Sequence, residues 1–132
     1  MIPGGLRIYL AVLPIDMRRS IDGLVIAVME RLAKDAKAER ALWVFANAAR
    51  DRVKVLWRDE TGWCLLYKRL EAHRVVLPPS APGASSVVVD ARTLSALLDG
   101  VARHRVKPTT RDIVNEARAK VRISDPTPTI GR

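Results

Sequence analysis

The chain has 132 residues, 48% of them hydrophobic, which fits one domain with a modest core. Its formal net charge of +9 favours a polyanionic partner. A single cysteine, Cys64, excludes an intrachain disulfide and a cysteine zinc cluster, and His73 and His104 lack metal-ligand spacing. No apolar run approaches the roughly 20 residues of a membrane helix, and the N-terminus lacks the order of a secretory signal. We therefore expect a cytoplasmic protein with no membrane contact and no cofactor.

The first part of the chain predicts a strand, a helix and a second strand. Residues 6–13 are apolar and favour a β-strand, which Pro14 ends. Ser20 is expected to be the N-cap of a helix that runs to about residue 37, with apolar residues at the i, i+3, i+4 spacing of one buried stripe. Residues 42–45 predict a short strand.

Two cations, Arg18 and Arg19, come just before the predicted helix, where positive charge is electrostatically disfavoured. An anion bound by the free backbone N–H groups and the guanidinium groups would account for them. In the alternative interpretation Asp16 and Asp22 simply neutralise both arginines. The residues alone leave both interpretations open.

Residues 50–71 predict a β-hairpin around which the sheet is organised. Asp59 to Gly62 supply the turn, with Gly62 suited to a left-handed position that closes a bulged loop. If Lys54, Arg58 and Lys68 share one face of the hairpin, they form a stripe that could track phosphates. The aromatic residues fit a core position better than base stacking, because they alternate with the charges.

Residues 74–77 predict a further strand, and residues 78–86 a loop. Residues 86–89 fit either a strand or an extended lead-in to a second helix at about residues 90–100. Because the hairpin turn is short and regular βαβ alternation is lacking, we expect an α+β fold with a mostly antiparallel sheet centred on the hairpin and packed against two helices.

The C-terminal part differs in charge. Residues 101–132 hold eight Lys or Arg and three Asp or Glu, so a quarter of the chain carries over half of the excess charge. We expect the α+β domain to span residues 1–102, and residues 103–132 to form a basic extension that is partly helical, near 110–121, or disordered. The extension either adds phosphate affinity or is a solvated segment without a role.

Several linked motifs resemble one family. Asp-Met-Arg-Arg at residues 16–19, followed by Asp-Gly-Leu at 22–24, is similar to a segment of the TnpB accessory proteins of the insertion-sequence 66 family. Phe45-x-Asn47, residues 51–57, Gly62, residues 67–71 and residues 97–101 match the same family in the same order. The resemblance covers roughly residues 1–102. It implies a small accessory protein encoded beside a transposase, with that transposase and a sister accessory protein as partners.

The chain departs from this family pattern at two places. Ala48 and Ala49 stand where basic residues are usual, and Arg58 stands where an aromatic residue is usual. These changes bear on any contact made by the first loop, although Arg50 and Arg52 keep charge nearby.

The sequence therefore favours a non-catalytic accessory to DNA transposition that binds DNA through the hairpin and the helix N-terminus. The expected phosphate contacts are Arg18, Arg19, Arg50, Arg52, Lys54, Arg58, Lys68 and Arg69. One alternative is a protein-interaction module that binds the transposase. A second is a metal-dependent nuclease that uses Asp51, Lys54 and Glu71, although no carboxylate spacing matches a transposase triad. A homodimer would cover exposed strand edges.

Overall fold

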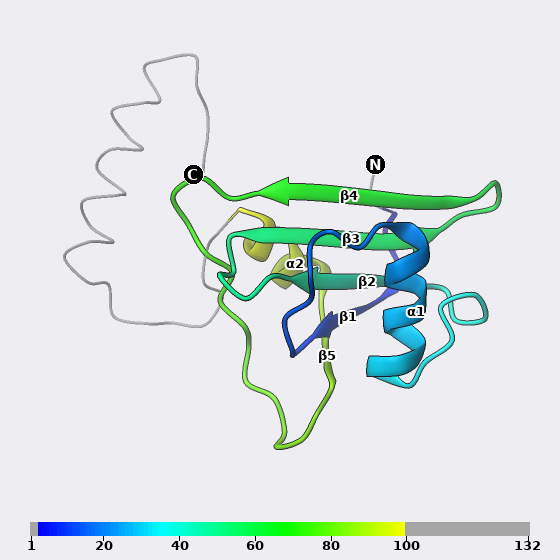
Figure 1. Cartoon of the computed structure of the whole chain (residues 1–132), viewed down its shortest axis with the longest axis horizontal. Helices are drawn as coiled ribbons and strands as arrows, with labels where there is room; N and C mark the ends of the chain where they lie inside the picture. The colour runs from blue at the N-terminus through cyan, green and yellow to red at the C-terminus, as the bar shows by residue number, and fades with distance from the viewer. Residues whose placement is uncertain (1–2, 100–132) are drawn as a thin grey trace, which may run out of the picture.

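The structure is a computed structural model that describes residues 3–99 (Figure 1). The basic extension predicted for residues 103–132, with its helix near 110–121, lies outside these residues. The described elements are β1 (Arg7–Ala11), α1 (Ile21–Leu32), β2 (Ala41–Ala46), β3 (Arg52–Arg58), β4 (Trp63–Arg69), β5 (Ser86–Val89) and α2 (Ala91–Leu98).

The five strands form one sheet in the order β4-β3-β2-β1-β5. Only β1 and β2 are parallel, because α1 crosses over between them, and the other three pairs are antiparallel. The predicted α+β class with a mostly antiparallel sheet and two helices is thus confirmed. The hairpin is not the centre of the sheet, however. It supplies the two strands at one edge, and β2 lies in the middle.

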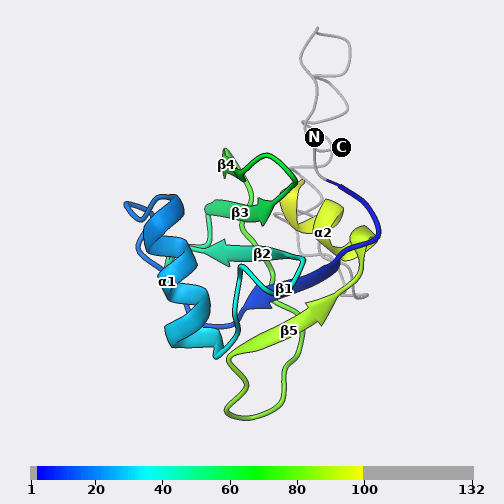
Figure 2. The ribbon, with the colours of Figure 1, turned by 90° about the vertical axis from the view of Figure 1, so that its right-hand side faces the viewer.

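The sheet has a helix on each face (Figure 2). Along one face, Leu24 and Val28 of α1 pack against Trp43 and Phe45 of β2. Along the other, Leu94 and Leu97 of α2 pack with residues such as Val44 and Val55. Both faces of β2 are therefore buried, which explains its uninterrupted apolar sequence.

The helix boundaries depend on local capping. Ser20 occupies the N-cap of α1, but its side chain makes no capping hydrogen bond. The helix ends at Leu32, earlier than the predicted residue 37, because Ala33 adopts a left-handed conformation with φ 55°. At α2, the Asp90 side chain accepts a hydrogen bond from Thr93 N at 2.7 Å and caps the first turn.

Two local predictions were wrong: the left-handed conformation of Gly62 and the strand at residues 74–77. Gly62 does not have the positive φ expected of it, because the Asp59 carboxylate closes the turn by accepting from Thr61 N and Gly62 N, each at 2.9 Å. Residues 74–77 are not a strand. Val75 is buried and its N–H donates to Arg50 O at 2.7 Å, so the segment is fixed to the β2–β3 turn instead. Residues 86–89 form a strand, β5, which pairs with β1.

Candidate nucleic-acid interface

The turn between β2 and β3 is held by one side chain. Asn47 Oδ1 accepts from Asp51 N at 3.0 Å and from Arg52 N at 2.9 Å, and Asn47 Nδ2 donates to Asp51 Oδ1 at 2.7 Å. Within this turn Arg50 adopts a left-handed conformation, φ 62°, which is uncommon for a residue with a side chain. The Leu70 N–H donates to Asp51 O at 2.7 Å, so the end of β4 is tied to the same turn.

Two arginines meet at this end of the hairpin. Arg52 and Arg69 are directly paired across β3 and β4. Because Leu70 N bonds to Asp51 O, the flanking pair is the hydrogen-bonded one, and Arg52–Arg69 falls at the closer, non-hydrogen-bonded spacing of about 4.5 Å between Cα atoms. Like charges in such a position destabilise a sheet. An anion bound between them would relieve the repulsion.

The two guanidinium groups have few protein partners. Arg52 Nε is buried, and no atom of residues 3–99 accepts a hydrogen bond from it. Arg69 Nε donates to Glu71 Oε2 at 3.2 Å in an exposed pair whose arginine side chain is 61% exposed. Exposed pairs of this kind contribute little stability, so Glu71 leaves Arg69 accessible to another anion.

The neighbouring carboxylate, Asp51, is committed to the turn. Its hydrogen bond from the Asn47 side chain, aided by the charges of Arg52 and Arg74, holds the pKa of Asp51 below its usual value. Asp51 therefore stays ionised without forming an ion pair with Arg52. We call Arg50, Arg52, Arg69 and Arg74 the basic hairpin end.

The two arginines before α1 have different partners. Arg18 forms a two-pronged pair with Asp16, with Nη2–Oδ2 at 2.7 Å, and this pairing lowers the pKa of Asp16 to about 2. The Arg18 side chain is nevertheless 91% exposed. Arg19 lies along the helix start and donates from Nη1 to Gly23 O at 3.2 Å. A Cβ atom at Gly23 would lie 3.2 Å from Arg19 Cβ, so glycine permits this close approach.

Lys54 is buried, unlike the other cations predicted to contact phosphates. Its Nζ donates to Met17 O at 2.7 Å and to Arg19 O at 2.6 Å, and lies 5.0 Å from the centre of the Tyr67 ring. These contacts tie the segment before α1 to the face of β3. Lys54 thus positions Arg18 and Arg19 beside the hairpin, and its own ammonium group is already satisfied.

The predicted stripe of Lys54, Arg58 and Lys68 does not form. Lys68 is paired with Val53, so its side chain lies on the α2 side of the sheet, whereas Lys54 and Arg58 lie on the α1 side. Arg58 ends β3 at the opposite end from Arg52, about 20 Å away at the usual strand rise. Lys68 instead approaches Asp99, with Nζ 4.0 Å from Oδ1.

The aromatic residues divide between the core and the surface. Trp57 is buried in the cluster below α2, and Trp63 packs partly against the cluster below α1. Tyr67 is 52% exposed on the α1 side, next to the Arg52–Arg69 pair. The core interpretation of the aromatics therefore applies to Trp57, and Tyr67 is accessible to a stacking partner.

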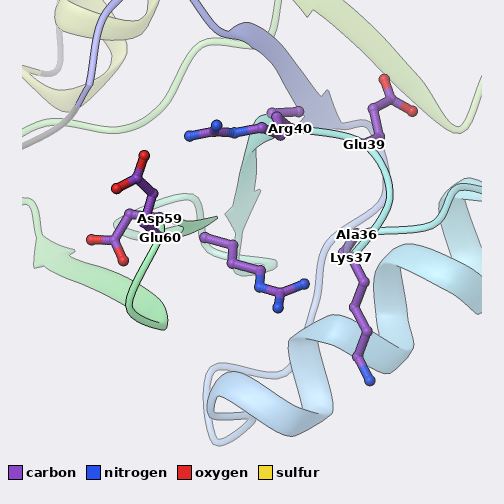
Figure 3. Close-up of a pocket in the computed structure, with 8 residues that line it drawn as sticks. Ala36, Lys37, Glu39, Arg40, Asp59 and Glu60 are labelled. Atoms are coloured by element: carbon purple, nitrogen blue, oxygen red, sulfur yellow. The ribbon is translucent and has the colours of Figure 1, made fainter.

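A polar pocket of about 220 Å³ lies at the other end of the hairpin (Figure 3). Its lining includes Lys37, Glu39, Arg40, Asp59 and Glu60, which come from the α1–β2 loop and the hairpin turn. The cations and carboxylates of the lining are interspersed, and the Asp59 carboxylate already accepts hydrogen bonds within the hairpin turn. The pocket therefore has no clear preference for an anion.

The residues of the nuclease hypothesis have separate partners. Asp51 bonds to Asn47, Lys54 to two carbonyl groups and Glu71 to Arg69. Between residues 3 and 99, no three His, Cys, Asp or Glu side chains are grouped so that they could hold a metal ion. Neither helix in that range is long and apolar enough to cross a membrane.

Comparison with known proteins identifies the family. The profile described as "IS66 Orf2 like protein" matches residues 6–108, which includes every element described above. The chain belongs to this family. An IS66 Orf2-like protein is an accessory protein associated with an insertion sequence, as the resemblance implied.

Two relatives come from Sinorhizobium fredii. The uncharacterized protein y4hO is 35% identical over 103 residues, covering 76% of this chain and 87% of y4hO. The uncharacterized protein y4jC is 34% identical over 103 residues, covering 78% of this chain and 86% of y4jC. No solved structure matches the chain.

The structure gives physical roles to two family motifs of this IS66 Orf2-like protein. Asn47 and Asp51 build the β2–β3 turn, and Gly23 accommodates Arg19. Our sequence analysis missed the Asn47 turn, although an Asn and an Asp four residues apart between two strands is a usable signal. It also missed the Arg52–Arg69 pairing, which follows once the hairpin register is counted from the turn.

Proposed function

We propose that this IS66 Orf2-like protein assists transposition without catalysing it, by binding DNA phosphates at the basic hairpin end. The observation that carries the proposal is the direct opposition of Arg52 and Arg69 at close cross-strand spacing. A phosphate placed between two guanidinium groups accepts charge-assisted hydrogen bonds from both and removes their mutual repulsion.

Three neighbouring features support the same site. Arg52 is half-buried and takes part in none of the ion pairs among residues 3–99, so its positive charge is available to an anion. Arg18 is almost fully exposed on the segment that Lys54 anchors to β3, so it extends the positive surface on the α1 side. Tyr67 lies exposed next to the arginine pair on that side, where its ring can stack on an unpaired base.

The experiment is fluorescence anisotropy of labelled duplex across a salt series. Wild-type protein is compared with Arg52→Gln, Arg69→Gln and Arg58→Gln, which make the same charge change on one hairpin. Loss of the arginine pair should weaken binding and reduce the slope of log K against log salt by about 1 for each phosphate contact removed. Arg58→Gln should weaken binding less, because Arg58 lies at the far end of β3.

Equal effects of all three substitutions would contradict a localised site. A duplex from the end of the insertion sequence and a duplex of scrambled sequence should be titrated side by side. Since phosphate contacts carry no sequence information, the Arg52–Arg69 pair should contribute equally to both.

A second candidate function is binding to the transposase. It is favoured by apolar side chains on the outer side of α1, where Ile26 is 44% and Met29 61% exposed one turn apart. A pull-down with purified transposase at high salt discriminates the two candidates, because apolar contact persists there and phosphate-type binding does not.

A further inference from the structure

Within residues 3–99, the strand at one edge of the sheet, β4, is long and no further strand pairs with it. β4 has seven residues, contains neither proline nor glycine, and pairs only with β3 among the described elements (Figure 1). The other edge strand, β5, has four residues. Proteins commonly protect edges by shortening them, by bulges or by charges, and β4 carries charges only at its last two positions, Lys68 and Arg69.

The backbone groups at this edge can be assigned from the hairpin. Asp59 N donates to Gly62 O at 2.9 Å, and Leu70 N donates to Asp51 O at 2.7 Å. Hydrogen-bonded pairs recur at every second position of an antiparallel ladder, so Cys64, Leu66 and Lys68 face β3. The residues with N–H and C=O groups directed away from β3 are therefore Trp63, Leu65, Tyr67 and Arg69.

We propose that β4 pairs antiparallel with β4 of a second copy, around a two-fold axis at Leu66, to form a continuous sheet across a homodimer. This register uses all seven residues of both strands. It places Leu65 opposite Tyr67 and Trp63 opposite Arg69, and all of these residues direct backbone groups outward. About eight backbone hydrogen bonds join the two strands in this arrangement.

Side-chain chemistry selects this arrangement. β4 is apolar in its first half and basic at its end, so antiparallel pairing places Lys68 opposite Cys64 and keeps like charges apart. Parallel pairing would place Lys68 beside Lys68 and Arg69 beside Arg69. On the α1 side, the exposed Tyr67 gains an apolar neighbour in Leu65, and Trp63 covers the stem of Arg69 from the second copy.

The dimer would carry two basic hairpin ends on one face of the sheet, related by the two-fold axis. Such symmetry matches two half-sites of a duplex or two duplexes. The pairing itself does not require DNA, so it is tested without DNA and independently of the proposed function.

The experiment is sedimentation of the full chain between about 1 and 200 μM, since a strand-edge interface is small and its affinity is expected in the micromolar range. Tyr67→Pro removes an outward N–H that β3 does not use, so it should yield a folded monomer. Circular dichroism reports whether this variant keeps its fold.

Oxidative cross-linking tests the register and does not depend on the proline variant. Lys68→Cys in the wild-type background places a thiol opposite Cys64 of the second copy, at about 4.5 Å between Cα atoms, within disulfide reach. It should form a covalent dimer, whereas Lys68→Cys combined with Cys64→Ser should not, because the two positions 68 lie about 13 Å apart along the strands. A monomer at every concentration, or a dimer without this cross-link, overturns the proposal.

Discussion

Arg52 and Arg69 are nearest neighbours across the β3–β4 ladder, and no carboxylate lies between them in the register. The pairs next to them combine Asp51 with Leu70 and Val53 with Lys68. Two positive charges therefore meet at the end of a hairpin whose edge strand bears the exposed side chains. A sheet optimised for stability alone would place an opposite charge or an apolar residue at one of these positions.

The first prediction follows from this repulsion. Arg69→Gln should raise the free energy of unfolding by about 0.2–1 kcal/mol at low salt, because it removes a like-charge cross-strand pair, while it weakens DNA binding. The measurement is urea unfolding at two salt concentrations, and the gain should shrink at high salt as screening increases. If Arg69→Gln destabilises the protein equally at both concentrations, the pair is not strained.

A second prediction concerns the buried lysine. Lys54→Met keeps the length of the stem but removes both hydrogen bonds to Met17 O and Arg19 O. Because hydrogen bonds to a charged group contribute about 1.5–3 kcal/mol, we expect a loss of this order in unfolding free energy. Lys37→Met, at an exposed position, is the matched control and should change stability by less than about 0.5 kcal/mol.

Lys54 and the hairpin also show how much of the fold could be predicted from the sequence. The hairpin, the position of its turn and the presence of both helices were predictable because strand alternation, helical spacing and turn residues are local signals. The conformation of Gly62 and the end of α1 at Leu32 were not predicted. The burial of Lys54 was not predictable, because helices cover both faces of the sheet and alternation alone does not identify an exposed face. The placement of the hairpin at the edge depends on the parallel pairing of β1 and β2, which are far apart in sequence.

The mistaken strand at residues 74–77 has a similar origin. Its apolar residues are explained by burial, since Val75 lies in the core cluster below α2. The Val75 N–H, however, donates to Arg50 O in the β2–β3 turn, and the segment does not join a ladder. The apolar composition of a segment therefore predicts that it is buried, but it does not predict which backbone groups the segment bonds to.

The third prediction tests the β2–β3 turn. Asn47→Ala removes one donor and one doubly used acceptor, which leaves Asp51 N and Arg52 N without a partner. We expect a loss of about 1–3 kcal/mol in unfolding free energy. Because this turn holds Arg50 and Arg52, DNA affinity should fall as well. Urea unfolding measures the loss, and a change below about 0.5 kcal/mol would show that these hydrogen bonds do not hold the turn.

The last prediction concerns pH and the hairpin turn. Hydrogen bonds from Thr61 and Gly62 hold the pKa of Asp59 below its usual value. A carboxyl group with a lower pKa in the folded protein stabilises the fold above its unfolded pKa, about 3.9, and this contribution is lost as the pH falls through the folded value. Asp59→Asn should therefore be less stable than the wild type at pH 6, and the difference should narrow below pH 4. Denaturation midpoints at a series of pH values measure it, and a difference that stays constant down to pH 2.5 would contradict the role of the ionised carboxylate.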